Sequence, residues 1–597
     1  MPNESLQSSP LPLKKVADKA TKNQLGTING VFVPCLLNIL GTILFLRIGF
    51  SVGQVGLIGT VAVFLLGEVI AVLTVLSISA LASNGRMSGG GSYYLISRSL
   101  GPAFGGSVGV LFYISYAVGI AFYVVSFAGA VATTAGYNAD AKLSFSGPVD
   151  AWVVLAIGTG SLALLLVVAC IGAGCFAKVN VMIFVGLFAT IMYSITFLYA
   201  SGEKLQQHCD PNDTDGGADA SLSSIQSHAE LLVNVGGAAL TSAVSNVTSS
   251  SCMHHRPTIA TLKTNLYPAL DHRPQCAGGQ VGDMCTWHQL FSIVFPAVTG
   301  IMEGANLSGD LKNPAASIGA GTLSAIALSL VVYGALMVAI ASTLDRHSLK
   351  SNMAVLQDSV GWWWVVLLGI GAATLSSALG ALFGGARVLQ AIARDELFPK
   401  FFSFIGYGST RGDEPRVAVI ITWVIAQSCL FLGTLDAIAP LITNFFLTSY
   451  GFTNLACFLL DTVGTPNYRP SFKYYSRTTS FLGFVLSFVV MFYLSWDFAL
   501  ATLILMAVIF AYIAATHTPK WDDVSQALIY HQVRKYLLNM RRSETVLSAV
   551  PNGPAENAAS EEEELLSVLD EEEEGGEGAC STTFYSFYLL LLLLWID

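Results

Sequence analysis

The chain has 597 residues, of which 53% are hydrophobic and 11% are charged, and its mean hydropathy is +0.62. An ordinary soluble domain has about 25% charged residues, so the composition excludes a disordered chain, a collagen, a nucleic-acid-binding protein and an ordinary soluble enzyme. It is typical of a protein that crosses a membrane many times. The formal net charge is −10, but the 11 acidic residues between Glu556 and Glu577, a stretch without Lys or Arg, account for all of this excess.

Twelve apolar stretches are long enough to cross a bilayer as helices, because a hydrocarbon core about 30 Å thick needs about 20 apolar residues. The predicted fold class is therefore an all-α membrane protein. We expect the twelve spans at residues 30–51, 55–82, 103–133, 150–174, 177–200, 289–307, 316–343, 360–386, 416–433, 436–460, 479–496 and 498–516. The first 25 residues are polar, so no signal peptide is predicted.

Lys and Arg residues predict the orientation, because short cytoplasmic loops carry an excess of them. They lie before the first span, between spans two and three, between eight and nine, between ten and eleven, and after span twelve. With twelve spans, all these segments fall on one side of the membrane. We therefore expect both termini in the cytoplasm, the long loop 201–288 outside, and a location in the plasma membrane.

The loop 201–288 has features of an extracellular segment. It contains four cysteines that are candidates for two disulfides in an oxidising compartment, with three pairings open: Cys209, Cys252, Cys276 and Cys285. Unpaired thiols are the alternative. Two acceptor sequons make Asn212 and Asn246 the glycosylation candidates.

Spans one and six are interrupted by Pro and Gly in corresponding positions. Span one contains Pro34 and Gly41, and span six contains Pro296, Gly300 and Gly304. The two spans begin two halves of five that start on opposite sides of the membrane, which is the arrangement of an inverted five-plus-five repeat. Unwound carbonyls can bind a cation, and half-helix N-termini can bind an anion. The alternative is that Pro and Gly only kink these helices or allow close packing.

Polar side chains inside other spans support an ion path. Tyr123 lies within span three, and Ser376 and Ser377 are adjacent in span eight. Hydroxyl oxygens can bind a hard, small cation, although Ser often bonds the carbonyl one helical turn earlier instead. Tyr450 in span ten can donate its hydroxyl to an anion or can be an interfacial aromatic residue. No P-loop, metal-ligand spacing or Ser/His/Asp arrangement is recognised, so we expect no enzyme activity and no cofactor.

Four longer motifs carry a family resemblance: Asn38–Arg47, Asn84–Pro102, Gly304–Leu311 and Arg469–Tyr475. They resemble the cation–chloride cotransporters, which belong to the amino acid–polyamine–organocation superfamily. The resemblance covers about residues 25 to 530. It implies twelve transmembrane helices with an inverted five-plus-five repeat, broken helices one and six, and symport of cations with chloride.

The resemblance also implies binding residues at matching positions. The potassium-binding candidates are the backbone oxygens of Asn38, Ile39 and Pro296 and the hydroxyls of Tyr123 and Thr299. The sodium-binding candidates are the carbonyls of Leu37, Leu40 and Ala373 and the hydroxyls of Ser376 and Ser377. The chloride-binding candidates are Gly41, Thr42 and Ile43 at one site, and Gly300, Ile301, Met302 and Tyr450 at the other.

Two positions indicate the subtype. The serine pair is typical of the sodium-dependent branch, and a Tyr at position 123 is typical of the potassium-transporting members, so together they favour a sodium-potassium-chloride symporter. The long loop between spans five and six instead resembles the potassium-chloride branch. A potassium-chloride symporter is one alternative, and a non-transporting family member that modulates another transporter is a second. An amino-acid permease of the same superfamily is less favoured.

Three positions depart from the family pattern. Glu303 replaces a small residue just past the second chloride position, where an ionised carboxylate would repel chloride unless it is protonated or paired. Glu68 is a second acid in the middle of a span, and such residues are functional candidates by default. Gly129 stands where the sodium-dependent branch has a Glu that pairs with the residue at the position of Arg47. The resemblance therefore predicts no such gate pair here.

The predicted domains are a cytoplasmic segment 1–29, a twelve-helix transporter domain 30–516, and a short cytoplasmic tail 517–597. The tail is acidic and is predicted to be disordered. It stands where the family has a large C-terminal domain that mediates dimerisation. The expected partners are the lipid bilayer and inorganic ions, with a homodimer left open and no nucleic acid.

Overall fold

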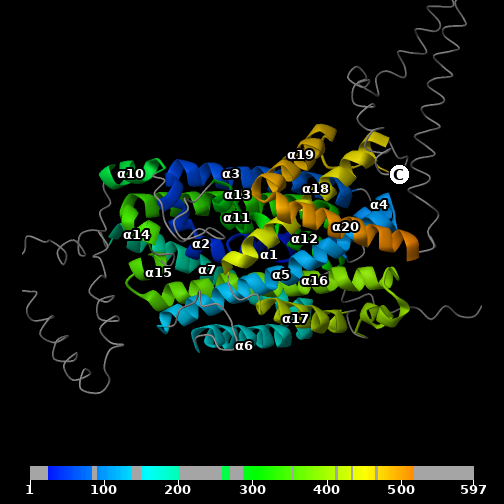
Figure 1. The fold of residues 1–597 in the computed structure, drawn as a ribbon, viewed down its shortest axis with the longest axis horizontal. Helices are drawn as coiled ribbons and strands as arrows, with labels where there is room; N and C mark the ends of the chain where they lie inside the picture. The colour runs from blue at the N-terminus through cyan, green and yellow to red at the C-terminus, as the bar shows by residue number, and fades with distance from the viewer. Residues whose placement is uncertain are drawn as a thin grey trace, which may run out of the picture. The chain divides into compact units, whose positions relative to one another are not determined.

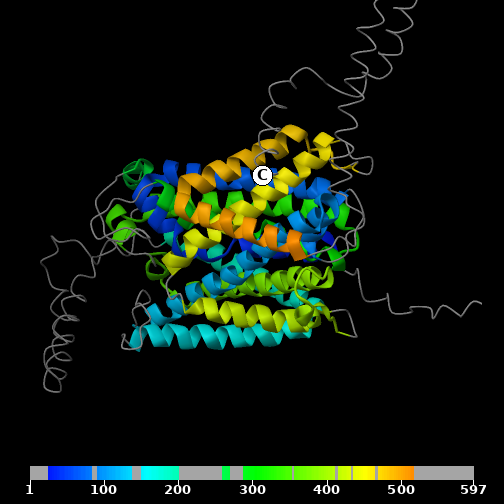
Figure 2. The ribbon, with the colours of Figure 1, turned by 45° about the vertical axis from the view of Figure 1, so that its right-hand side comes forward.

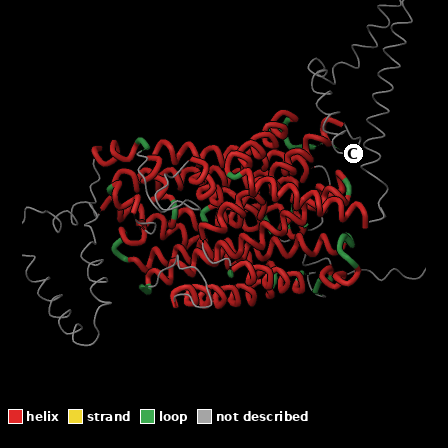
Figure 3. The backbone as a smooth tube through the Cα atoms, viewed as in Figure 1, coloured by secondary structure: helices red, strands yellow, loops and turns green. Residues whose placement is uncertain are grey.

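A computed structural model describes residues 25–83, 90–136, 149–200, 259–268, 287–351, 355–409, 414–431, 435–463, 468 and 470–516. The described residues all belong to one unit, Met1–Leu528. Within that part of the chain the regular structure is helical (Figure 3), and one isolated bridge joins Leu25 to Leu311.

The helices follow the predicted spans. In the first half they are η1 (Ile28–Phe32), α1 (Val33–Ile39), α2 (Thr42–Leu46), α3 (Ile48–Ser83), α4 (Gly91–Leu100), α5 (Pro102–Thr134), α6 (Val149–Ile171) and α7 (Ala173–Ala200). From there to the middle of the second half they are α10 (Ile259–Leu266), α11 (Trp287–Val294), η3 (Phe295–Met302), α12 (Glu303–Asn306), η4 (Ser308–Asp310), α13 (Pro314–Thr343), α14 (Arg346–Ser351), α15 (Val355–Ser359) and α16 (Trp363–Arg394). The last are η5 (Lys400–Gly406), α17 (Arg416–Leu430), α18 (Leu435–Val463), α19 (Arg477–Leu494) and α20 (Trp496–Thr516).

Within the described residues, 10 helices are long and apolar enough to cross a membrane. Such segments must be helical, because lipid offers no hydrogen-bonding partner to an open backbone. α17 is a shorter apolar helix, and α18 is a continuous helix of 29 residues that is not among the 10. The all-helical membrane fold is thus confirmed, whereas the count of twelve spans and the inverted repeat stay predictions.

The junction of the first two predicted spans differs from expectation. The sequence predicts a gap at residues 52–54, but the helix that begins at Ile48 continues through these residues and is kinked at Gly56, whose φ of 73° and ψ of 173° are not helical. A Cβ at Gly56 would lie 2.6 Å from the carbonyl carbon of Tyr267, just after α10. The direction change therefore occurs at Gly56, because only glycine adopts these angles readily and fits against that backbone.

The two interrupted spans occupy the centre of the helix bundle. In Figure 1, α1, α2 and α12 lie between α3 and α13 on one side and α5 and α16 on the other. Figure 2 shows α6 and α17 side by side at one edge. Burial follows this arrangement: the most apolar window of Trp287–Asp310 is 100% buried, whereas that of α6 is 28% buried. The outer helices thus present apolar side chains to lipid and enclose the polar interruptions.

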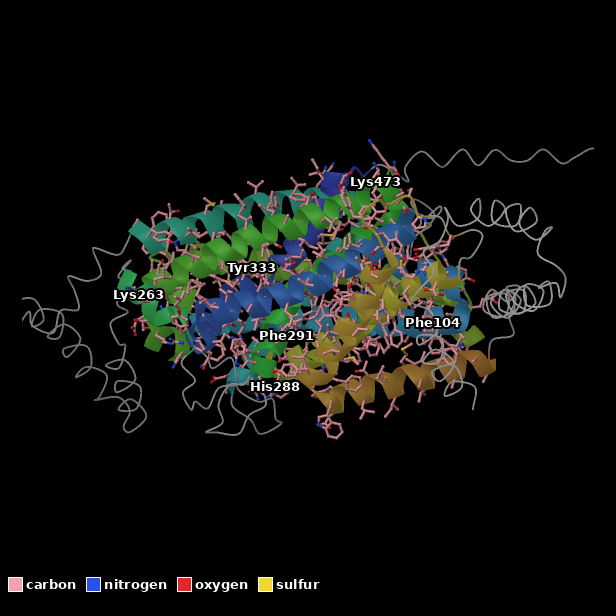
Figure 4. All side chains as sticks on the ribbon, turned by 90° about the horizontal axis from the view of Figure 1, so that it is seen from above. Phe104, Lys263, His288, Phe291, Tyr333 and Lys473 are labelled. Carbon is pink, nitrogen blue, oxygen red and sulfur yellow. The ribbon has the colours of Figure 1, made fainter. Side chains whose placement is uncertain are left out.

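Part of the predicted extracellular loop folds against one end of the bundle. The Asn265 side chain of α10 donates hydrogen bonds to the carbonyls of Ala341 at 2.9 Å and Leu344 at 2.8 Å. Figure 4 shows Lys263 of α10 and Lys473 at opposite ends of the bundle. The predicted orientation assigns these two residues to opposite sides of the membrane, and which end faces the cytoplasm stays a prediction.

Replacing Gly56 by Ala is expected to lower thermal stability. The change forces a side chain into a nearly glycine-only conformation, which costs of order 1–3 kcal/mol, and crowds Tyr267. The measurement is the thermal unfolding midpoint of the purified protein in detergent. The matched control is Gly160→Ala in α6, where a Cβ meets nothing within 4 Å. Equal midpoints for the two variants would contradict the assignment of the turn to Gly56.

Candidate functional site

The first interrupted span breaks at Leu40 and Gly41. α1 ends at Ile39, and Leu40 (φ −76°, ψ 39°) and Gly41 (φ −80°, ψ −149°) leave the helical conformation before α2 begins at Thr42. A Cβ at Gly41 would lie 2.9 Å from the Asn38 carbonyl oxygen and 3.3 Å from the Ser377 hydroxyl. The break predicted from the sequence is therefore present, and glycine lets the chain pass close to α16.

The second interruption takes a different form. Span six is not simply unwound: η3 is a 3₁₀ helix from Phe295 to Met302 between two short α-helices. A Cβ at Gly300 would lie 2.5 Å from the Asn38 Cβ. The 3₁₀ segment of span six therefore packs against the last turn of α1, next to the break in span one, and the contact needs glycine at position 300.

The side chains and carbonyls predicted for potassium lie around this contact. The Tyr123 and Thr299 hydroxyls are 3.5 Å apart, and Thr299 donates to the Pro296 carbonyl at 2.9 Å. The Ile39 carbonyl, across the contact, accepts a hydrogen bond of 2.9 Å from Tyr333. All of these residues and Asn38 are buried. Spans one, three and six thus bring the predicted oxygens together, and Tyr333 of α13 bonds one of them.

The sodium candidates form a cluster between α1 and α16. Ser376 and Ser377 both donate to the Ala373 carbonyl, at 3.0 and 2.9 Å. The Ser377 hydroxyl also lies 3.4 Å from the Leu37 carbonyl, and the Leu40 carbonyl belongs to the adjacent break. The bond to an earlier carbonyl that the sequence left as the alternative is therefore formed. It does not remove the lone pairs of the hydroxyl oxygens, which are what a cation would use.

The chloride candidates lie at two helix interruptions. Gly41, Thr42 and Ile43 begin α2, which has no side-chain hydrogen bond at its N-terminus. Gly300, Ile301 and Met302 form the end of η3. Tyr450 of α18 donates its hydroxyl to the Thr299 carbonyl at 2.5 Å. Chloride can accept a hydrogen bond from the Tyr450 hydroxyl only if the bond to the Thr299 carbonyl is broken.

The two unexpected acids are buried in different places. Glu303, 2% exposed, accepts a hydrogen bond of 3.2 Å from the Asn38 side chain. Glu68, 4% exposed, accepts one of 3.2 Å from Ser329 of α13. Glu303 therefore borders the contact of the two interrupted spans, whereas Glu68 lies between α3 and α13.

Tyr333 is a residue that sequence reasoning missed. It is fully buried on α13, labelled in Figure 4, and its ring packs on Phe64 with centroids 4.5 Å apart. Its hydroxyl donates a hydrogen bond to the carbonyl of Ile39, next to the break. The signal was a polar aromatic residue in an apolar span, four residues after Ser329 and so on the same helix face.

The predicted absence of a gate pair concerns Arg47 and Gly129. Arg47 is buried, and its guanidinium donates to the Leu46 carbonyl at 3.4 Å, while Gly129 has no side chain with which to form the gate pair. The disulfide candidates Cys209, Cys252, Cys276 and Cys285 and the glycosylation candidates Asn212 and Asn246 lie outside the described residues.

A helical membrane bundle with two broken helices meeting at a buried polar centre defines a membrane transport protein. The family model for amino acid permeases matches residues 30–253 and 255–542. The chain therefore belongs to the amino acid permease family, which consists of membrane transporters and not enzymes.

Individual relatives are named for ion or solute transport. The chain is 34% identical to vacuolar cation-chloride cotransporter 1 of Saccharomyces cerevisiae over 88% of this chain and 43% of that protein. It is 34% identical to human solute carrier family 12 member 9 over 87% of this chain and 54% of that protein. It is 30% identical to human solute carrier family 12 member 2, over 89% and 43%. The chain thus spans about half the length of these curated relatives.

Replacing Tyr333 by Phe is expected to destabilise the protein by about 1 kcal/mol, because it leaves the buried Ile39 carbonyl without this donor. The ring and its packing on Phe64 are retained. The thermal unfolding midpoint in detergent measures the effect. The control is Tyr407→Phe, at a position that is 70% exposed. An unfolding midpoint for Tyr333→Phe as high as that of the control would mean that the hydrogen bond to the Ile39 carbonyl does not stabilise the protein.

Proposed function

We propose that this chain is a secondary active symporter that couples the movement of Na⁺, K⁺ and Cl⁻ across a membrane without net charge. The observation that carries the proposal is the contact of the interrupted spans at Asn38 and Gly300, with oxygens of Tyr123, Thr299 and Ser377 around it. The relative named vacuolar cation-chloride cotransporter 1 supports the same class of substrate.

Two cation sites are proposed at this centre. Backbone oxygens of Asn38, Ile39 and Pro296 with the hydroxyls of Tyr123 and Thr299 bind potassium. The carbonyls of Leu37, Leu40 and Ala373 with the hydroxyls of Ser376 and Ser377 bind sodium. Both sets offer only oxygen, the ligand that hard cations prefer, and the short distances between their members support the assignment.

Two chloride sites complete the transported charge. One is formed by backbone N–H groups at Gly41, Thr42 and Ile43. The other is formed by Gly300, Ile301 and Met302 with the Tyr450 hydroxyl. Chloride beside each cation group lowers the electrostatic cost of moving ions through a low-dielectric interior. Alternating access would then proceed by rocking of the two five-helix repeats around the central site.

The wider architecture is part of the proposal. The domains are a cytoplasmic segment 1–29, a twelve-span transporter domain 30–516 and a cytoplasmic tail 517–597. In this arrangement the loop 201–288 is extracellular, glycosylated and cross-linked by two disulfides. A homodimer is compatible with it, and gel filtration with light scattering measures the oligomeric state.

The proposed function predicts that cells expressing the chain take up radioactive rubidium, a potassium substitute, only when both Na⁺ and Cl⁻ are outside. Cells expressing no added protein are the control. Uptake that needs Cl⁻ but is indifferent to Na⁺ would replace the proposal by potassium-chloride symport. No uptake by correctly delivered protein would favour a modulator of another transporter.

Location decides how this assay is run. One relative is named as a vacuolar protein, so surface biotinylation is measured first. We propose the plasma membrane, and intact cells suffice if the protein is labelled there. If the protein is found only inside the cell, the plasma-membrane assignment is wrong and the same ion substitutions are made with isolated vesicles.

Replacing both Ser376 and Ser377 by Ala is expected to raise the Na⁺ concentration for half-maximal rubidium uptake about tenfold or more, since each lost 1.4 kcal/mol of binding free energy is about a factor of ten. The control is Ser324→Ala on α13, an exposed serine that also bonds an earlier carbonyl in its helix. Unchanged sodium dependence in the double variant would mean that the serine pair does not bind sodium.

A further inference from the structure

A buried carboxylate and a buried amide oxygen lie together where the interrupted spans meet. Glu303 and Asn38 are 2% and 5% exposed. The Asn38 Nδ2 atom donates to Glu303 Oε1 at 3.2 Å, so the nitrogen of this amide is used. Its other polar atom, Oδ1, is buried and has no hydrogen-bond partner among the described residues. This oxygen belongs to the same amide group as the nitrogen that bonds the carboxylate, so a ligand that reaches both the oxygen and the acid has to fit beside this amide.

The Glu303 carboxylate packs against two glycines of α16. A Cβ at Gly380 would lie 3.4 Å from the carboxyl carbon, and one at Gly384 would lie 3.3 Å from Oε2. Residues four apart lie on one face of a helix, so these glycines form a stripe without side chains against which the acid packs. The Asn306 amide borders the same glycine, since its Nδ2 would lie 2.8 Å from the Cβ at position 384.

The acid is close to the proposed sodium site but separate from it. Gly380 follows Ser376 by four residues, which is a little more than one helical turn, or about 6 Å along α16. Ser377 faces the Leu37 carbonyl, whereas Glu303 faces the Asn38 side chain. The proposed potassium site uses the backbone oxygen of Asn38, so the Oδ1 atom belongs to neither set of ligands.

The charge of Glu303 is not balanced within the described part of the protein. The ion pairs recorded there involve Arg387 and Arg477 and leave Glu303 out. An ionised carboxylate taken out of water without a counter-charge costs several kcal/mol, and an amide oxygen without a donor adds to that cost. A proton on the carboxylate would remove only the first of these costs, whereas one monovalent cation between the two groups would remove both.

We propose that the Glu303 carboxylate and the Asn38 amide oxygen form an additional binding site for a monovalent cation at the junction of the interrupted spans. The inference rests on the proposed function only in taking a transported cation as the ligand. A single carboxylate matches a single positive charge, and both ligands are oxygens that Na⁺ and K⁺ accept.

The test is the number of cations bound by the purified full chain in detergent. Equilibrium binding of radioactive rubidium and sodium is measured at saturation, in buffers in which gluconate replaces chloride. Glu303→Gln keeps the shape and removes the charge, and is expected to bind one cation fewer per chain than the unaltered protein. Asp497→Asn, at an exposed carboxylate of α20, is the control and is expected to bind the same number.

A second variant distinguishes loss of the site from a folding defect of Glu303→Gln. Asn38→Ala removes Oδ1 but keeps the Cβ that packs on Gly300 and the backbone oxygen proposed for potassium. It is expected to lose the same single cation. Ser376→Ala with Ser377→Ala should still bind the cation at Glu303, so combining these changes with Glu303→Gln should lower the bound number further. Thermal unfolding of each variant reports whether it is folded.

The outcomes separate this inference from the proposed function. If Glu303→Gln or Asn38→Ala is folded and binds as many cations as the unaltered protein, with unchanged affinity, the additional site is wrong and the symport proposal stands on the uptake assay. If the unaltered chain binds neither Rb⁺ nor Na⁺ in this chloride-free buffer, the additional site is wrong, whereas the symport proposal is decided by the uptake assay, which contains chloride. Loss of one cation in the folded variants supports the site.

Discussion

The contact between Asn38 and Gly300 is the constraint on which the rest of the polar centre depends. With 2.5 Å between the Asn38 Cβ and any Cβ at position 300, only glycine allows the two spans to meet. Interrupting a helix in an apolar interior frees backbone carbonyls that must find partners. Tyr333, Tyr450 and Ser377 supply hydroxyls to carbonyls of the two interrupted spans. The same carbonyls keep a second lone pair that a desolvated cation can use.

The surrounding helices separate this polar interior from the lipid. α6 and α20 have apolar windows that are only 28% and 22% buried, whereas the window of the interrupted span six is 100% buried. Polar backbone at membrane depth is tolerated only where protein or a water-filled path surrounds it. The division between apolar outer helices and an interrupted centre is therefore a direct consequence of the bilayer as a solvent.

Glu303 distinguishes this chain's centre from the pattern that its motifs resemble. The motif Gly304–Leu311 follows at once in the sequence, so the acid lies inside an otherwise family-like segment. Gly380 and Gly384 accommodate it on α16, and Asn38 gives it a hydrogen bond across the contact. The acid is thus buried and contacted by residues of two other spans, α1 and α16.

Local composition was enough to predict the helices and their breaks. Runs of apolar residues become helices in lipid, and Gly41 and Gly300 lie where the structure departs from the α-helix. Pro34 lies in the first turn of α1, where proline is tolerated. The family motifs also identified Tyr123 and the serine pair as polar groups worth attention. The position of the turn at Gly56 and the 3₁₀ form of η3 were not predictable, because both depend on neighbours outside their own segment.

What only the tertiary structure decided is which polar groups meet. Ser377 reaches the Leu37 carbonyl across 340 residues, Tyr333 reaches Ile39 across 294, and Asn38 reaches Glu303 across 265. A single sequence records residue types and spacing along a helix, which set its period and its breaks. It does not record which faces of two distant helices pack together, because that depends on the shapes of all the side chains between them.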